Sequence, residues 1–293
     1  MVTEASRDQA MLSLEGLSVG DAFGELLLRR YPRFTWQSDI PLGPWEWTDD
    51  THMALSVVEV MCKMGRIDQD ALAQAFAVRF VDDPDRGYAA GASKLLGRIA
   101  EGKDWRVVSP KLFVGGSYGN GAAMRAAPIG GYFRGDPERA AKEARLSAEV
   151  THAHPEGQAG AIAVAVAASI ASLIEPSAKK DLLDQVLEFV PHSVTSQGIA
   201  TARGIADDQL TDAIRLLGTG QKVSAQDTVP FCLWVAANFP DDFELALRTT
   251  LQGMGDCDTT CAIVGGIVAL SAKRVPQVFL DRREPLPRIE CHN

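Results

Sequence analysis

The sequence is poor in cysteine and in positive charge, and it lacks a long hydrophobic segment. Its five cysteines are an odd number without a paired CxxC pattern, so we expect free thiols, with Cys257 and Cys261 serving packing. A net charge of −9 argues against a surface that grips nucleic acid or anionic lipid. The longest apolar run, residues 159–174, is short for a membrane span, and no N-terminal stretch looks like a signal peptide. These absences favour a soluble, cytoplasmic protein without a membrane partner or sequence-specific nucleic-acid binding.

Alternating patterns typical of β-strands are also nearly absent. Segments such as "HMALSVVEVMCKMG" and "DQDALAQAFAVRF" carry apolar residues at three- and four-residue spacing, which indicates helices. The small-residue runs at 157–172 and 261–272 predict buried helices that pack closely at the centre of a bundle. No fixed-period repeat or domain linker interrupts the chain, so residues 1–293 are predicted to form one compact all-α, multi-helix domain. Only the charged tail from about Asp281 is expected to be loose.

The stretch "WTDDT", residues 47–51, sets two acids side by side before an apolar run. Thr48 or Asp49 could serve as the N-cap of the following helix, accepting from a free backbone N–H, while the other acid favours the helix dipole. This explanation accounts for one acid better than for both Asp49 and Asp50, because adjacent carboxylates repel each other.

A second group of the same kind occurs in "GDCDTTCAIVGG", residues 255–266, where Asp256, Asp258 and Thr259 again precede an apolar run. Carboxylate and hydroxyl oxygens are the ligands that hard cations such as Mg²⁺ or Mn²⁺ prefer. Four clustered aspartates would be costly to keep ionised, whereas two divalent cations would balance their charge. The two blocks therefore predict a site for two divalent cations that ties the ends of the chain together.

Two further stretches have the composition of ligand-binding loops. "GGSYGNGAAMR", residues 115–125, has four glycines in its first seven residues, so its backbone N–H groups could approach an anion, although a plain turn is an equal alternative. "THAHPEG", residues 151–157, puts His152 and His154 two apart, without the spacing of a zinc motif. A substrate contact or a helix-end cation is the better interpretation of these histidines.

Five blocks in order, "GLSVGDAFG", "WTDDT", "SYGNGAAMR", "THAH" and "GDCDTTCAIVGGIVA", resemble the signature blocks of the ADP-ribosylglycohydrolases. The resemblance spans nearly the whole chain. It implies a compact all-α fold with two divalent ions, usually Mg²⁺ or Mn²⁺, at the bottom of a cleft.

The resemblance also implies roles for individual residues. Asp21 matches a position near the cleft, where a structural helix-end role is equally plausible. By matching position, the metal ligands would be Thr48, Asp49, Asp50, Asp256, Asp258 and Thr259. The loop around the pyrophosphate and ribose of ADP-ribose would be Ser117, Tyr118, Gly119 and Asn120, with His152 as a substrate-contacting histidine.

The chemistry implied by the resemblance is hydrolysis at C1″ of a substituted ribose, which needs an oriented sugar, a water and a proton carrier. In the family this carrier is a glutamate that follows the aspartate of the "GDAFG" block by seven residues. In this sequence that position holds Leu28. Glu25 is the nearest acid and lies about one helical turn away. We therefore take Glu25 as the candidate acid/base, with Asp49 or Asp256 as the alternative.

These features predict a dimetal-dependent hydrolase that removes ADP-ribose from a protein side chain, a nucleobase or a small acceptor. The alternative is a catalytically silent relative that binds ADP-ribose-like ligands or has a structural role. The intact metal block favours the hydrolase, and Leu28 favours the alternative.

Overall fold

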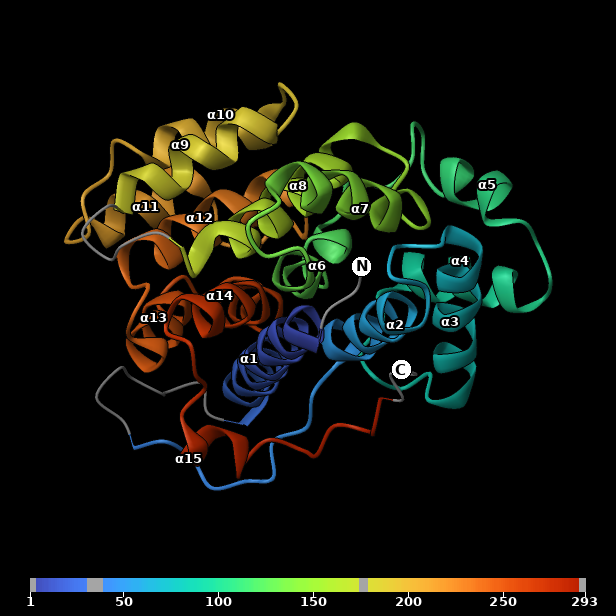
Figure 1. Cartoon of the computed structure of the whole chain (residues 1–293), viewed down its shortest axis with the longest axis horizontal. Coiled ribbons are helices and arrows are strands. Elements are labelled where there is room, and N and C mark those ends of the chain that lie inside the picture. The colour runs from blue at the N-terminus through green and yellow to red at the C-terminus, as the bar shows by residue number, and fades with distance from the viewer. Residues whose placement is uncertain (1–3, 31–38, 174–178, 290–293) are drawn as a thin grey trace.

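The structure is a computed structural model that describes residues 4–30, 39–173 and 179–289. These residues form helices and turns with two isolated β-bridges and no strand, which confirms the predicted all-α class (Figure 1). No helix in the described ranges is long and apolar enough to span a membrane. The α-helices are α1 (Glu4–Arg30), α2 (Asp49–Met64), α3 (Gln69–Asp82), α4 (Ala90–Ala100), α5 (Trp105–Val108), α6 (Ala127–Tyr132), α7 (Pro137–Glu149), α8 (Pro155–Ala171), α9 (Lys179–Phe189), α10 (Val194–Ala202), α11 (Leu210–Leu217), α12 (Ala225–Asn238), α13 (Phe243–Leu251), α14 (Cys257–Ser271) and α15 (Gln277–Leu280).

The first and fourteenth helices form a close antiparallel pair, side by side in Figure 1. Three glycines spaced four residues apart line the facing side of α1. A Cβ atom added to any of them would lie 2.0–2.3 Å from a backbone oxygen of α14: the pairs are Gly16 with Gly265, Gly20 with Cys261, and Gly24 with Cys257. Only glycine permits this approach. The seam brings Asp21, between two of these glycines, next to the N-terminal end of α14.

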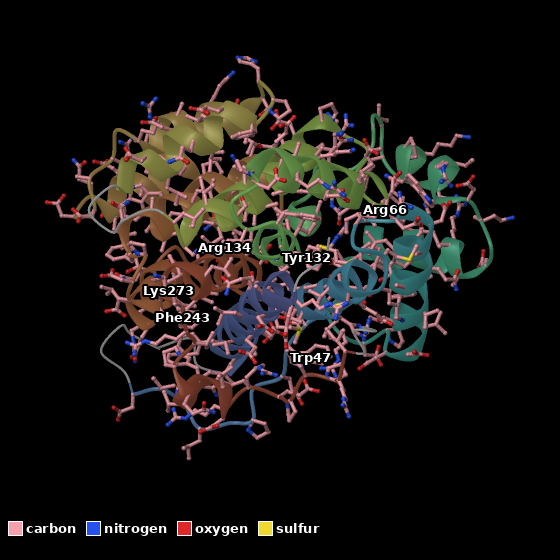
Figure 2. The ribbon with its side chains drawn as sticks, in the orientation of Figure 1. Trp47, Arg66, Tyr132, Arg134, Phe243 and Lys273 are labelled. Atoms are coloured by element: carbon pink, nitrogen blue, oxygen red, sulfur yellow. The ribbon has the colours of Figure 1, made fainter. Side chains whose placement is uncertain are left out.

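Further helices complete the core around this pair. The small-residue helix α8 is buried almost all round and packs against α6, α7, α12 and α14, as its sequence predicts. Tyr132, labelled near the centre of Figure 2, is buried in α6 and donates a hydrogen bond from its hydroxyl to the carbonyl oxygen of Met61 in α2 at 3.1 Å. The helix α3 packs against α2, α4 packs against α3, and α5 packs against α4 (Figure 1).

The tail from about Asp281, which the sequence leads us to expect to be loose, has backbone contacts at Arg282 and Glu284. The backbone of Trp45 donates to the carbonyl oxygen of Arg282 at 2.6 Å and accepts from the N–H of Glu284 at 2.7 Å. The Trp45 ring is fully buried, 5.8 Å from the ring of Phe279 in α15. This segment is therefore held by backbone bonds to a residue far away in the sequence.

The cysteines largely follow expectation. Cys232, Cys257 and Cys261 are buried free thiols, and the last two form the packing surface that meets α1. Cys62 is disulfide-bonded, so the expectation of a free thiol is wrong there. Cys291 lies outside the described residues.

Candidate active site

The site begins where α2 begins. Thr48 has an extended backbone and caps the helix, its Oγ1 accepting from the backbone N–H of Asp50 at 3.4 Å. The capping interpretation of this threonine is therefore correct. It leaves both acids of the first turn without a capping role, and Asp50 is 2% exposed.

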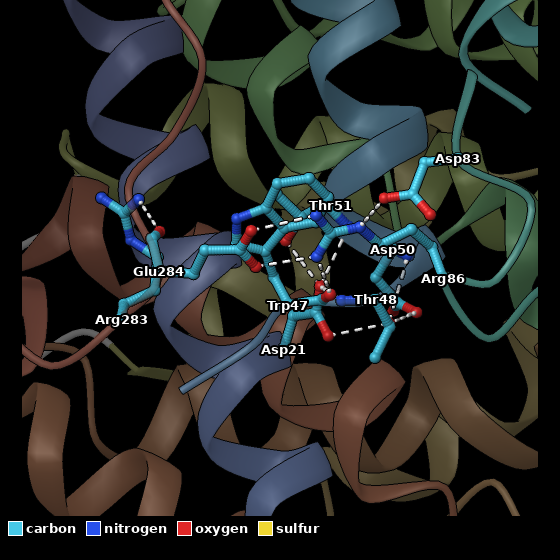
Figure 3. A network of polar contacts seen from close by, with 9 residues as sticks. All are labelled: Asp21, Trp47, Thr48, Asp50, Thr51, Asp83, Arg86, Arg283 and Glu284. Carbon is cyan, nitrogen blue, oxygen red and sulfur yellow. Dashed lines mark hydrogen bonds and ion pairs between the residues drawn. The ribbon is translucent and has the colours of Figure 1, made fainter. Parts of the chain in front are cut away.

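Asp21 organises this turn from below (Figure 3). Its carboxylate accepts from the backbone N–H and hydroxyl of Thr48, at 2.9 and 2.8 Å, and from the same two groups of Thr51, at 3.0 and 2.5 Å. Burial raises the pKa of Asp21 to about 7, while the Thr51 hydrogen bond opposes that rise. Because its oxygens face four donors, the geometry favours the structural role for Asp21 over a substrate contact.

The second acidic block opens α14 in the same neighbourhood. Asp256 lies at the N-cap position, but its Oδ2 accepts from the side-chain amide of Asn120 at 2.7 Å instead of capping. That amide also donates to the hydroxyl of Thr228 at 3.2 Å. Asp258 accepts from the backbone N–H of Thr259 at 2.9 Å. The glycine-rich loop is thus joined to the acidic block through Asn120.

Electrostatics link the two blocks. Burial, followed by the charges of Asp21 and Asp258, raises the pKa values of Asp49 and Asp50 well above their usual range. Burial and the charge of Asp258 raise the pKa of Asp256 to about 7. Each carboxylate therefore carries a cost for being ionised that a nearby cation would remove.

The donor set has the chemistry that hard divalent cations prefer. No lysine or arginine among the described residues forms an ion pair with Asp49, Asp50, Asp256 or Asp258. Asp50 Oδ1 is buried without a hydrogen-bond partner, which is a costly position for a carboxylate oxygen. In the described parts of the chain, no three acidic, histidine or cysteine side chains converge as a ready-made ligand cluster. The chemistry of the oxygens fits Mg²⁺ or Mn²⁺, although the side chains are not gathered around one point.

A cavity of about 520 Å³ connects these acids to the predicted binding loop. Its lining includes the four aspartates, which we call its acidic end, and apolar side chains from α4 and from residues 112–114. The predicted residues on its wall are Asp49, Asp50, Asp256, Asp258, Thr259, Ser117, Tyr118, Gly119, Asn120 and His152. Ten residues from four separate sequence blocks thus meet around one space.

Two glycines of the predicted binding loop have left-handed backbones. Gly115 and Gly116 have φ values of +81° and +89°, and a Cβ on Gly116 would lie 2.7 Å from the backbone nitrogen of His154. Gly119 has φ −59°, so its backbone needs no glycine, but an added Cβ would lie 3.3 Å from His152 Nε2. The first two glycines form the loop, and Gly119 leaves room beside the histidine.

The two histidines of the "THAH" block have different surroundings. His154 caps α8, its Nδ1 accepting from the backbone N–H of Glu156 at 3.1 Å. His152 lines the cavity, and its Nδ1 lies 2.7 Å from the hydroxyl of Thr151. That hydroxyl accepts from Arg125 at 2.8 Å. Sequence reasoning assigns no role to Arg125 or Thr151, although both lie in the quoted blocks.

Glu25 faces a different space. It lines a second cavity of about 450 Å³ together with Thr48, Arg86 and Glu284, and this cavity shares Gly87 with the first. Arg86 donates to both carboxylate oxygens of Glu284, at 2.7 and 2.9 Å (Figure 3). Its guanidinium carbon lies 3.7 Å from the centre of the Trp47 ring. The side chain of Leu28 lies outside the described part of α1.

Comparisons with known proteins agree with this architecture. A family model described as ADP-ribosylglycohydrolase matches residues 3–290. ADP-ribosylhydrolase ARH3 of Homo sapiens is 31% identical over 254 residues, covering 75% of this chain and 69% of the relative. ADP-ribosylarginine hydrolase Tri1 of Serratia proteamaculans is 26% identical over 302 residues, covering 97% and 77%. A solved structure titled "ADP-ribosylglycohydrolase-related protein complex" superposes with a TM-score of 0.69 at 22% identity, covering 96% of this chain and 94% of the other.

Proposed function

The chain belongs to the ADP-ribosylglycohydrolase family of glycosidic-bond hydrolases, and from this premise we propose that it cleaves the C1″ bond joining ADP-ribose to an acceptor. One observation carries the proposal. The glycine-rich loop and His152 share a cavity of about 520 Å³ with four aspartates, so an anion-binding wall faces an acidic end. A dinucleotide-like ligand needs both features, because its pyrophosphate and its reacting ribose have different requirements.

The acidic end would hold two divalent cations, Mg²⁺ or Mn²⁺. Their ligands would come from Thr48, Asp49, Asp50, Asp256, Asp258 and Thr259, and the unpartnered Oδ1 of Asp50 supports this assignment. When bound, such cations supply charge stabilisation for the ribose oxygens and the attacking water. Thr48 contributes first as the helix cap and as a donor to Asp21 at 2.8 Å.

The other residues bind and orient the substrate. Ser117, Tyr118 and Gly119 would hold the pyrophosphate and ribose, with His152 beside them. Asn120 donates to Asp256 at 2.7 Å, and this hydrogen bond connects the binding loop to the acidic end. Leu95 and Leu96 of α4 are fully buried and contribute an apolar part of the cavity wall.

Proton transfer in this proposal belongs to a carboxylate. Asp49 and Asp256 line the cavity itself. Glu25 lies in the neighbouring cavity, beyond Gly87, one turn after Asp21 on α1. In the chain without cations, burial and the charge of Asp258 raise the pKa of Asp256 to about 7, so that carboxylate can hold a proton near neutral pH. Glu25 stays the candidate that the sequence singles out.

The decisive experiment measures free ADP-ribose released from arginine-, serine- and nucleobase-linked substrates, with Mg²⁺, with Mn²⁺ and with a chelator. We expect metal-dependent release from at least one acceptor class. The arginine-linked substrate is included because Tri1, the Serratia relative, is named for it. ADP-ribose binding without release from any substrate would support the catalytically silent relative instead. The absence of both binding and release would overturn the proposal.

A further inference from the structure

Arg125 is a fully buried cation without a carboxylate partner among the described residues. Its Nη1 donates to the carbonyl oxygen of Gly121 at 2.9 Å, and its Nη2 donates to the carbonyl oxygen of Ser147 at 3.0 Å. Its guanidinium carbon lies 4.6 Å from the centre of the Phe76 ring. The side chain therefore joins the binding loop to the C-terminal end of α7.

The fourth contact of Arg125 determines where a proton must lie. Nη2 also donates to the hydroxyl oxygen of Thr151 at 2.8 Å, and a guanidinium can only donate. The Thr151 hydroxyl therefore keeps its single proton for another acceptor. Among the described residues, the acceptor within reach of this hydroxyl is His152 Nδ1 at 2.7 Å, which can receive the proton when that ring nitrogen is unprotonated.

The other ring nitrogen then carries the hydrogen. Nε2 lies against the binding loop, 3.3 Å from the positions that a Cβ would take on Gly119 and Gly121. It has no acceptor among the residues that the structure describes, although His152 lines the cavity. Burial, followed by the charge of Arg125, lowers the pKa of His152 to about 3, so the ring is neutral near pH 7.

We propose that Arg125 and Thr151 are positioning residues that hold His152 as the neutral Nε2–H tautomer, which donates one hydrogen bond to an oxygen of the bound ligand. The inference rests on the proposed function, which supplies phosphate and ribose oxygens as acceptors. It assigns His152 to binding and excludes it from acid–base chemistry, because the ring neither gains nor releases a proton during turnover. This chain of hydrogen bonds also gives the buried Arg125 a role that does not require an ion pair with the nearby aspartates.

Long-range ¹H–¹⁵N NMR of the full chain labelled at histidine reads the tautomer directly, without ligand. The chain has five histidines, and the spectrum of His152→Asn identifies the signals of this one. We expect Nε2–H in the wild type and in Thr151→Ser, which keeps the hydroxyl. We expect its loss, or a mixture of tautomers, in Thr151→Val and in Arg125→Gln, whose amide oxygen can accept the threonine proton.

Calorimetry with ADP-ribose provides the second measurement. Thr151→Val should weaken binding about tenfold and Thr151→Ser by about twofold or less, the range of one neutral hydrogen bond. An Nδ1–H or doubly protonated His152 in the wild type at pH 7 would overturn the inference even if the variants do not fold. A Thr151→Val protein with wild-type tautomer and affinity would overturn it as well. The expected tautomer in a protein that neither binds ADP-ribose nor releases it from any substrate would support the positioning of His152 and reject the proposed function.

Discussion

The carboxylate of Asp21 on α1 accepts hydrogen bonds from both the backbone N–H and the hydroxyl of Thr51 on α2, at 3.0 and 2.5 Å. The same carboxylate accepts two more from Thr48. An aspartate at the glycine seam of α1 and α14 thus holds the turn that presents Asp49 and Asp50. The acids of the first block owe their position to a residue about thirty places earlier in the sequence.

Asp21→Asn should therefore destabilise the protein. An amide nitrogen would replace one acceptor oxygen and face N–H and O–H donors, which leaves buried donors unpaired. We expect a loss of about 1–3 kcal/mol in the free energy of unfolding, measured in urea. Glu15→Gln, a partly buried acid on the same helix, is the control and should change stability by about 0.5 kcal/mol or less. Equal stability of the two variants would contradict the structural role.

Asp258 provides the test of the proposed metal site. Asp258→Asn should weaken Mg²⁺ or Mn²⁺ binding at least tenfold and lower metal-dependent activity by a similar factor, because the amide removes one negative ligand. The helical circular dichroism should be unchanged. Asp181→Asn, an exposed acid in the first turn of α9, is the matched control. Full activity and full metal affinity in the Asp258 variant would reject the dimetal assignment.

The binding loop allows a comparison between two glycines. Gly119→Ala should weaken ADP-ribose binding with little loss of stability, since its φ of −59° suits alanine and only the space beside His152 is filled. Gly116→Ala should destabilise the fold, because its φ is +89° and its Cβ would lie 2.7 Å from the backbone of His154. Calorimetry and thermal unfolding measure the two effects. Unchanged ADP-ribose affinity in Gly119→Ala would leave the loop as a simple turn.

His152 gives the stability a definite pH dependence. Its pKa falls from 6.5 in the unfolded chain to about 3 in the folded one, so the folded state binds fewer protons. The contribution of His152 is complete above about pH 6.5 and is lost as the pH falls through that value toward 3. The stability advantage of wild type over His152→Gln should therefore be about 2 kcal/mol smaller at pH 5 than at pH 7.5. The exposed His192→Gln serves as the control, and a pH-independent difference for His152→Gln would contradict the burial of a neutral ring.

Local patterns predicted much of this molecule. Helical spacing and the near absence of alternation were sufficient for the all-α class, and acids before apolar runs marked the starts of α2 and α14. Gly16, Gly20 and Gly24 are four residues apart, and this spacing indicates a helix face that a second helix can approach closely. A search for such glycines would have predicted the face of α1 that meets α14. These features repeat over short stretches, so they can be read from sequence alone.

Features that depend on distant partners could not be predicted in this way. The tail after Asp281 is charged and contains proline, which suggested a loose end, yet its backbone pairs with Trp45. The role of Arg125 depends on Thr151, which is 26 residues away. Helix geometry put Glu25 one turn from Asp21, but only packing determines which of two cavities it faces.

Glu25 remains the sequence-based candidate for the missing acid/base at Leu28. It lies on α1, one turn beyond the aspartate that holds the first acidic block, in the cavity that shares Gly87 with the main one. Positioned acid–base catalysis typically contributes 10²–10⁴-fold. Glu25→Gln should therefore lower kcat by about that factor, while the affinities for ADP-ribose and Mg²⁺ stay nearly unchanged, because the amide keeps the shape of the side chain.

The control must separate proton transfer from the general charge of the second cavity. Glu46 also lines that cavity, so Glu46→Gln removes the same charge there and should leave kcat within about twofold of the wild type. Equal losses in both variants would indicate an electrostatic effect of the cavity. A Glu25→Gln enzyme with wild-type kcat would exclude Glu25 and transfer the role to Asp49 or Asp256, which line the main cavity directly. A pH–rate profile of that variant, measured with Mg²⁺, then shows whether a carboxylate still transfers the proton.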